Sequence, residues 1–104
     1  MESKEQVELR TYKFYTDPGH GWMEVDFQEL KDLELVDKIS PYSYIKPAEQ
    51  KVLLEEDCDA PLFIGTLEVL HKVVVKLDFV EIPFNGCGAV RNLPGYSHHK
   101  TLLA

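Results

Sequence analysis

Residues 7–26 read VELRTYKFYTDPGHGWMEVD, and this stretch decides the fold because two strand-like segments flank a set of turn residues. Residues 7–15 are rich in aromatic and β-branched side chains, which favour a β-strand. In DPGHG, Pro18 fixes φ and Gly19 can take a positive φ, so the chain is expected to turn there. WMEVDF then follows as a short strand. The sequence therefore predicts a hairpin over residues 7–26 with a connection of roughly five residues.

A short helix and a second hairpin are expected next. Asp26 lies three positions before Glu29, the spacing of a capping box. Phe27, Leu30 and Leu33 then recur at helical spacing, and Val36 is a further candidate for the same face. This helix should end before KISPYSY, because the residue that precedes a proline is pushed out of helical conformation. YSYI and KVLLEE flank KPAEQ and predict two further strands joined by a turn.

The second half of the chain predicts one more helix, one more strand and an arm. DCDAP offers Asp57 and Asp59 as caps for a helix. Its expected apolar face consists of Leu62, Phe63, Leu67 and Leu70, with Thr66 and Val69 beside them. VVVKLDFVEI is apolar enough for a central strand. From about residue 83, glycines and prolines among polar residues predict an irregular C-terminal arm.

These elements together predict a single α+β domain over residues 1–104. The expected order is ββαββαβ, with a mostly antiparallel sheet of about five strands and two helices on one face. A chain of 104 residues can bury a core without metal or disulfide staples.

Composition narrows the function classes. Eleven Lys and Arg stand against eighteen Asp and Glu, for a net charge of −7, and no basic run compensates locally. This argues against a nucleic-acid binder, which needs a positive surface. We expect no contact with a membrane and no cofactor, because apolar runs are too short to span a bilayer and phosphate-binding glycine loops are lacking. The N-terminus lacks a signal-peptide core, so we expect a cytoplasmic protein with reduced thiols. A Cys58–Cys87 disulfide is the alternative.

Four segments contain polar and aromatic residues that could form a binding site. The corner DPGHGW and the segment SPYSY contribute hydroxyl, imidazole and indole groups, and the tail RNLPGYSHHK is locally basic. Each segment also has an ordinary structural interpretation, namely a turn with a core tryptophan, a half-buried strand start and a solvated terminus. In the fourth, LEEDCD, strand alternation sends Glu55 and Glu56 to opposite faces, so helix capping is favoured over a cation site. The candidate binding residues are His20, Trp22, Tyr42, Tyr44, Arg91, Tyr96 and His98, and we assign no catalytic or metal-binding residue.

The segments FYTDPGHGWMEV, LKDLELVDKISPYSY and LEEDCD resemble a family of small uncharacterised proteins encoded mainly by bacteriophages and other mobile elements of bacteria. The similarity covers roughly Tyr12 to Phe63. The family often ends in a short tail with Arg and Tyr, to which Arg91 and Tyr96 of VRNLPGY would correspond. Where the family has a short and often basic hairpin turn, this chain has IKPAEQ. The resemblance implies a phage-like genomic setting and no particular mechanism.

The leading hypothesis is a non-enzymatic accessory protein that binds a host macromolecule, with a bacterial defence component as one candidate partner. A second hypothesis is a binder or sponge for a small anionic, nucleotide-like ligand, or a small hydrolase, in which His20 and the C-terminal arm converge on one pocket. A third is a metal site built from His20, Cys87, His98 and His99. The sequence leaves open a symmetric homodimer formed through sheet edges and a monomer whose tail covers the edge.

Overall fold

The computed structural model describes residues 8–17, 19–81, 90 and 92–104. The described elements are β1 (Glu8–Thr16), β2 (Gly21–Asp26), α1 (Phe27–Asp32), η1 (Val36–Lys38), β3 (Tyr44–Lys46), η2 (Pro47–Glu49), β4 (Lys51–Glu55), α2 (Asp59–Leu70), β5 (Val73–Glu81), η4 (Tyr96–His98) and α3 (His99–Leu102), where η marks a 3-10 helix.

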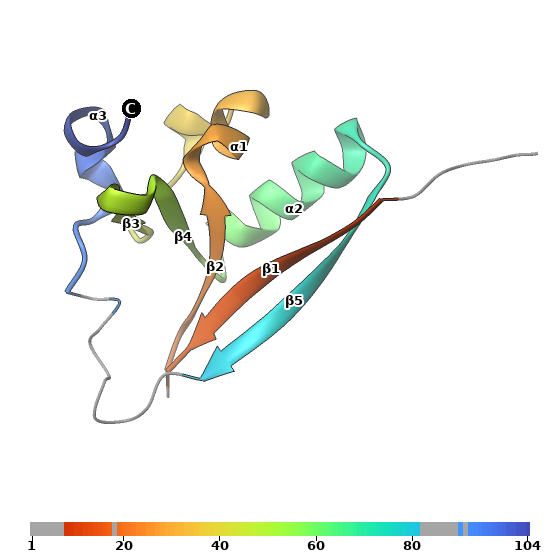
Figure 1. Cartoon of the computed structure of the whole chain (residues 1–104), viewed down its shortest axis with the longest axis horizontal. Helices are drawn as coiled ribbons and strands as arrows, with labels where there is room; N and C mark the ends of the chain where they lie inside the picture. The colour runs from red at the N-terminus through yellow and green to blue at the C-terminus, as the bar shows by residue number, and fades with distance from the viewer. Residues whose placement is uncertain (1–7, 18, 82–89, 91) are drawn as a thin grey trace, which may run out of the picture.

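The five strands form one mixed sheet in the order β3-β4-β2-β1-β5 (Figure 1). Three of its pairings are antiparallel, and only β1 and β5 run parallel. The α+β class and the mostly antiparallel sheet predicted from the sequence are therefore confirmed. The prediction that VVVKLDFVEI is a central strand is wrong, because among the described strands β5 pairs only with β1, at the end of the sheet. Its apolar residues lie on an edge strand, with Val74 52% and Phe79 66% exposed.

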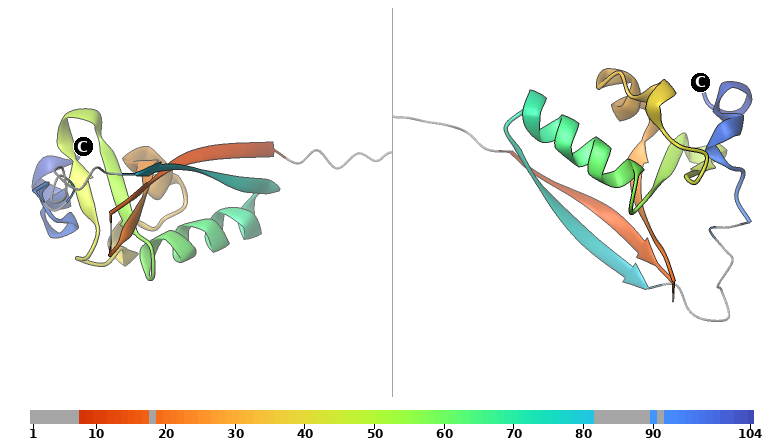
Figure 2. Two further views of the ribbon diagram at one scale, coloured as in Figure 1. Left: turned by 90° about the horizontal axis from the view of Figure 1, so that it is seen from below. Right: turned by 180° about the vertical axis from the view of Figure 1, so that it is seen from behind.

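The sheet has a different core on each face. On one face, α1 and α2 complete the larger core, where Tyr12 of β1 meets Phe63 of α2 edge-to-face at 5.6 Å. Figure 2 shows α2 running along this face of the β1–β5 ribbon. On the other face a smaller cluster forms around Trp22, Leu53 and Val90. The strand alternation of β2 thus sends Trp22 and Met23 into separate cores.

The predicted hairpin over residues 7–26 is confirmed, but its strands stay together only near the turn. Thr16 pairs with Gly21 and Phe14 with Met23, after which β1 and β2 diverge (Figure 1). Gly21 is required by a close approach, since a Cβ there would lie 2.4 Å from a ring carbon of Phe14. Gly19 does not use the positive φ that glycine allows. β1 therefore leaves β2 and continues as a two-stranded ribbon with β5.

Helix α1 ends earlier than the helical spacing predicts. The capping box of Asp26 and Glu29 forms as expected. Glu34, however, has a φ of 59°, which ends the helix in a left-handed residue. The N–H of Leu35 then donates to the carbonyl of Leu30 over 2.8 Å, and both side chains are buried in the larger core. This is the Schellman arrangement, built here on a glutamate instead of the usual glycine.

Helix α2 buries a narrower face than predicted. Ala60, Phe63 and Leu67 are buried, whereas Leu70 is 59% exposed. The helix packs against a ribbon of only two strands in this region, which covers a narrow stripe of its surface (Figure 2). The other apolar residues assigned to this face, Leu62 and Val69, are exposed as well. The predicted caps are also wrong, since the N-cap position belongs to Cys58.

The C-terminal arm is more ordered than predicted in its described part. It contains η4 and α3, and its residues 94–96 lie along the outer edge of β3. The N–H of Ile45 donates to the carbonyl of Pro94, and the N–H of Tyr96 donates to the carbonyl of Ser43. Tyr96 and Leu103 are buried in the larger core. The arm thus covers the β3 edge of the sheet.

Candidate functional site

The corner between β1 and β2 is held by Asp17. Its carboxylate oxygen Oδ1 accepts hydrogen bonds from the N–H groups of Gly19 and His20, and its own N–H donates to the carbonyl of His20. This fixes the exposed His20 ring over Trp22, with the ring centroids 6.0 Å apart and the planes at 23°. Trp22 itself is 2% exposed. The expectation that Trp22 packs into the core is confirmed, and the imidazole lies against it.

The SPYSY segment is held by a buried carboxylate from α2. Asp59 is 2% exposed and accepts hydrogen bonds from the hydroxyls of Ser40 and Ser43 over 2.6 and 2.5 Å. The Ser43 hydroxyl also accepts the N–H of Glu55. Tyr42 lies between the two anchored serines and is exposed, and Tyr44 follows Ser43 as the first residue of β3. The acidic residue expected to cap a helix therefore holds this segment in place instead.

The end of β4 places two carboxylates on opposite faces, as strand alternation predicts. Glu55 is the cross-strand neighbour of Trp22, and its Oε1 accepts the N–H groups of Asp57 and Cys58. Glu56 lies on the other face, close to Gly21. Glu55 thus stabilises the LEEDCD turn, and its side chain lies on the same face of the sheet as that of Trp22.

These three segments meet in one pocket of about 380 Å³. This volume lies within the range of small-ligand sites. The described residues that line it are His20, Trp22, Pro41, Tyr42, Tyr44, Glu55, Asp57 and Cys58. The rings of Trp22 and Tyr44 meet at 72° with centroids 6.1 Å apart. The structure therefore brings together four of the residues singled out from the sequence. We call this the aromatic pocket.

The charge of the aromatic pocket is acidic. Glu55 and Asp57 line it, and its described lining includes no Lys or Arg. Cys58 also faces this environment, and desolvation, together with the carboxylate of Glu55, raises the pKa of its thiol. A thiol with a raised pKa holds little thiolate at neutral pH and is a weak nucleophile. Aromatic faces beside carboxylates attract a cation and disfavour an anion.

The predicted tail residues lie elsewhere. Tyr96 is 2% exposed, and its hydroxyl donates to the carbonyl of Val36 over 2.5 Å. Burial, followed by the charges of Asp37 and Asp59, raises the pKa of this hydroxyl. His98 is exposed on η4 and is not part of the aromatic pocket's lining. Arg91 lies outside the described residues.

The proposed metal ligands do not assemble in the part of the chain that the structure describes, where no group of three or more His, Cys, Asp or Glu side chains could hold a metal ion. Cys87, one of those ligands and the partner of Cys58 in the alternative disulfide, lies outside the described residues. Cys58 is exposed.

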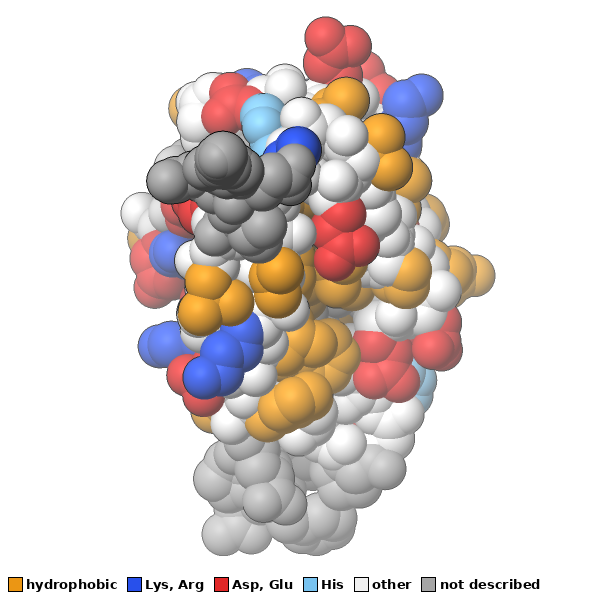
Figure 3. All heavy atoms as spheres, turned by 90° about the vertical axis from the view of Figure 1, so that its right-hand side faces the viewer, with side chains coloured by type: hydrophobic (Ala, Val, Ile, Leu, Met, Phe, Trp, Pro, Cys, Tyr) orange, Lys and Arg blue, Asp and Glu red, His pale blue; other side chains and the backbone are white. Residues whose placement is uncertain are grey.

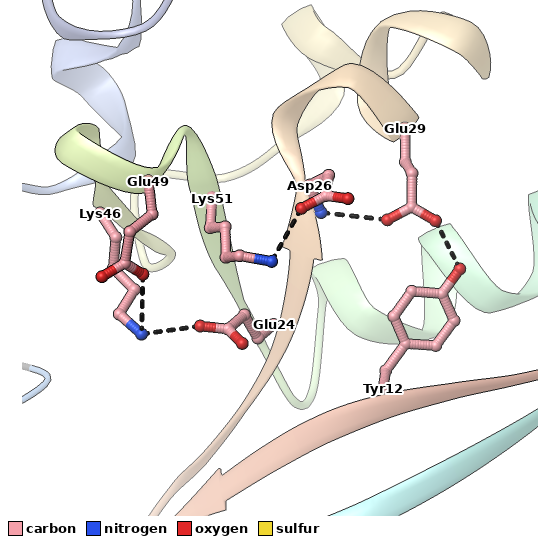
Figure 4. Close-up of polar contacts among 7 residues, drawn as sticks. All are labelled: Tyr12, Glu24, Asp26, Glu29, Lys46, Glu49 and Lys51. Atoms are coloured by element: carbon pink, nitrogen blue, oxygen red, sulfur yellow. Dashed lines mark hydrogen bonds and ion pairs between the residues drawn. The ribbon is translucent and has the colours of Figure 1, made fainter.

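A second and larger cavity, of about 690 Å³, opens where β1 and β2 diverge. Several of its charged residues pair with one another (Figure 4). Lys46 contacts Glu24 at 2.7 Å and Glu49 at 3.4 Å, and Lys51 contacts Asp26 at 2.9 Å. Burial lowers the pKa of Lys46, but the hydrogen bond and charge of Glu24, with Glu49, outweigh it and raise the pKa, and the hydrogen bond to Asp26 raises the pKa of Lys51.

Sequence reasoning missed this cavity, because its residues come from four strands and from α1 and η2, and they meet only through the pairing of the sheet. On its other side, the Tyr12 hydroxyl donates to Glu29 over 2.6 Å (Figure 4), and burial together with this bond raises the pKa of Tyr12. Arg10 lies 3.7 Å from the same carboxylate. Since these cations and anions neutralise one another, the cavity is a less selective site for a charged ligand than the aromatic pocket.

Comparisons with known proteins add no assignment, since no family model, curated protein or solved structure matches the chain. Among the helices of the described residues, none is long and apolar enough to cross a membrane.

Proposed function

We propose that this chain is a non-enzymatic, phage-type accessory protein that binds a host protein through the aromatic pocket. The observation that carries the proposal is the convergence of His20, Trp22, Tyr42 and Tyr44 on one concave site. Aromatic residues gathered at a concave site are typical of protein-binding surfaces. Tyr42 is 67% exposed, so its ring is accessible to a partner that docks on the pocket.

The group that fits this pocket best is a basic side chain of the partner. Aromatic faces attract a guanidinium or ammonium group, and Glu55 and Asp57 supply the opposite charge. The net charge of −7 favours approach to a basic surface. An arginine suits the site better than a lysine, because its planar guanidinium can stack on a ring while donating to a carboxylate.

The alternative of an anionic, nucleotide-like ligand or a hydrolase fits the pocket less well. Glu55 and Asp57 would repel a phosphate, and the described lining holds no Lys or Arg to offset them. The hydrolase alternative required His20 to meet the C-terminal arm in one pocket, but Tyr96 is buried and His98 is not part of the pocket's lining.

Trp22 is the only tryptophan of the chain, so its fluorescence reports on the pocket directly. We would titrate the protein with arginine-rich, lysine-rich and glutamate-rich peptides of equal length. The expected result is a saturable change with the arginine peptide, a weaker one with lysine and none with glutamate. Equal responses to all three, or a preference for the acidic peptide, would overturn the proposal.

Two variants locate the binding. Tyr42→Ala removes an exposed ring and should weaken arginine-peptide binding about 3- to 10-fold, the range of one cation–π contact. Asp57→Asn should weaken it by a similar factor. The matched control is Glu56→Gln, which removes the same charge on the opposite face and should leave affinity unchanged. If Glu56→Gln weakens binding as much as Asp57→Asn, the peptide binds by overall charge and not in the pocket.

A further inference from the structure

The two edges of the sheet differ in what lies against them. Residues 94–96 of the arm cover the outer edge of β3 through hydrogen bonds with Ser43 and Ile45. At the other end, β5 pairs with β1 over its whole length of nine residues. No strand among the described residues pairs with its outer side, and β5 forms the outer boundary of the sheet in Figure 1.

This free edge is apolar as well as long. Val74 is 52% exposed on one face of β5, and Phe79 is 66% exposed on the other. The neighbouring Leu9, opposite Val74 in the ladder, is 61% exposed. Figure 3 shows hydrophobic side chains gathered over the centre of the adjoining side of the molecule, with charged side chains around them. An exposed edge of this kind is a template for pairing with another strand.

We propose that the strand which pairs with this edge is β5 of a second copy of the same chain, running antiparallel across a two-fold axis at Leu77. This interface is independent of the aromatic pocket. It would join two five-stranded sheets into one continuous sheet.

The charges of β5 are self-complementary in this register. Leu77 is the midpoint of Val73–Glu81, so a two-fold axis there pairs all nine residues. It places Lys76 directly opposite Asp78 of the second copy, and the reverse pair forms on the other side of the axis. Within each copy Asp78 already lies beside Lys13 in the ladder. Its carboxylate would therefore lie between two ammonium groups, one from each copy.

Neighbouring registers are disfavoured by the same residues. Moving the axis to residue 76 would place Lys76 opposite Lys76 of the second copy. Moving it to residue 78 would place Asp78 opposite Asp78 of the second copy. Like charges directly opposite one another destabilise a strand pair. A slip by one residue would bring side chains of opposite faces together. The sequence of β5 thus selects the register centred on Leu77.

Apolar pairs complete the interface in that register. Val75 would lie opposite Phe79 of the second copy on the helix-covered face, where Phe79 now contacts only Phe14 among the described aromatic rings, at a centroid distance of 5.4 Å. Val74 would lie opposite Val80 on the other face. Aromatic and β-branched side chains paired across strands stabilise a sheet.

Charge reversal tests both the interface and its register. We would measure the mass of the protein in solution by sedimentation or light scattering over a range of concentrations up to millimolar. The unmodified chain should be a dimer. Lys76→Glu should be monomeric, because two pairs become like-charged, and so should Asp78→Lys. An equimolar mixture of these two variants should recover the dimer. In a mixed dimer each pair between positions 76 and 78 again joins opposite charges, one Glu with Lys and the other Lys with Asp.

The control is Lys38→Glu, which makes the same change in net charge on exposed η1 and should leave the dimer intact. Circular dichroism establishes that each variant is folded. In a background with Cys58→Ser and Cys87→Ser, a mixture of Lys76→Cys and Asp78→Cys chains should cross-link more than either alone. A monomeric unmodified chain, a mixture that stays monomeric, or equal cross-linking in all three samples would overturn the proposal.

Discussion

The hydroxyl of Ser43 donates a hydrogen bond of 2.5 Å to Asp59, and both side chains are fully or almost fully buried. This contact joins the strand start at SPYSY to the first turn of α2, sixteen residues later in the chain. It also sets the position of Tyr42 and Tyr44, which flank Ser43 and line the aromatic pocket.

Replacing Asp59 should therefore cost more stability than replacing an exposed aspartate. Asp59→Ala leaves the hydroxyls of Ser40 and Ser43 without their acceptor, so we expect a loss of about 2–4 kcal/mol in the free energy of unfolding. Urea denaturation measures it. Asp57→Asn, at an exposed position, is the comparison and should change stability by less than about 0.5 kcal/mol. Similar losses in the two variants would mean that the Asp59 network contributes little.

Gly21 and Gly19 provide a second matched pair. A Cβ on Gly21 would lie 2.4 Å from Phe14 and 2.5 Å from a Glu56 oxygen, whereas one on Gly19 would meet nothing within 4 Å. Gly21→Ala should destabilise the chain by about 1–3 kcal/mol through overpacking. Gly19→Ala should be neutral or slightly stabilising. The thermal midpoints of the two variants check this, and a neutral Gly21→Ala would contradict the close packing at the hairpin.

The left-handed end of α1 predicts a stabilising substitution. Glu34 holds a φ of 59°, which costs a non-glycine residue about 1 kcal/mol. Glu34→Gly should raise the free energy of unfolding by roughly 0.5–1 kcal/mol, because glycine adopts this conformation without strain. Glu68→Gly, in the last turn of α2, should lower it by up to about 1 kcal/mol and serves as the contrast. Destabilisation by both substitutions would argue against the Schellman end.

Stability should fall at alkaline pH. The pKa values of Tyr12, Tyr96 and Lys46 are all raised on folding, from ordinary values of 10.0 for tyrosine and 10.5 for lysine. The unfolded chain therefore releases these protons first as pH rises, so the stability that these groups contribute is complete below about pH 10 and is lost above it. The midpoint of urea denaturation, measured from pH 7 to 11, should stay constant up to about pH 10 and then decrease.

A substitution at Tyr96 tests whether this residue contributes to the loss of stability at alkaline pH. Tyr96→Phe removes a buried group with a raised pKa, so its midpoint should fall less steeply above pH 10 than that of the unmodified chain. At pH 7 it should be less stable by about 1 kcal/mol, because the bond to the Val36 carbonyl is lost. Tyr42→Phe, whose ring is exposed, should keep the original slope. An unchanged slope in Tyr96→Phe would exclude Tyr96 as a source of the pH dependence.

Local patterns in the sequence predicted the local elements of the fold well. The turn at DPGHG, the capping box at Asp26 and Glu29 and the second hairpin all form where expected, because each depends on residues close together in the chain. The edge position of β5 was not predictable in this way. An apolar run can be a central strand or an edge strand with a partner, and only the pairing distinguishes them.

The candidate site was predicted in part for the same reason. His20, Trp22, Tyr42 and Tyr44 were chosen by residue type and by their position at bends, and the structure brings them together. Tyr96 has the same chemistry but is buried, because the arm folds back along β3 and directs its hydroxyl to the Val36 carbonyl. Burial of that kind depends on contacts between residues sixty positions apart, which no local pattern contains.

The cover that residues 94–96 place over β3 decides how far this sheet can grow. A sheet with two open edges can add copies without end and form a fibre, whereas a sheet with one open edge is complete once that edge is paired. If β5 pairs with a second copy as proposed, assembly by strand pairing would therefore stop at two copies. Removing the arm, and not altering β5, is the change that would convert the proposed closed pair into an aggregating filament.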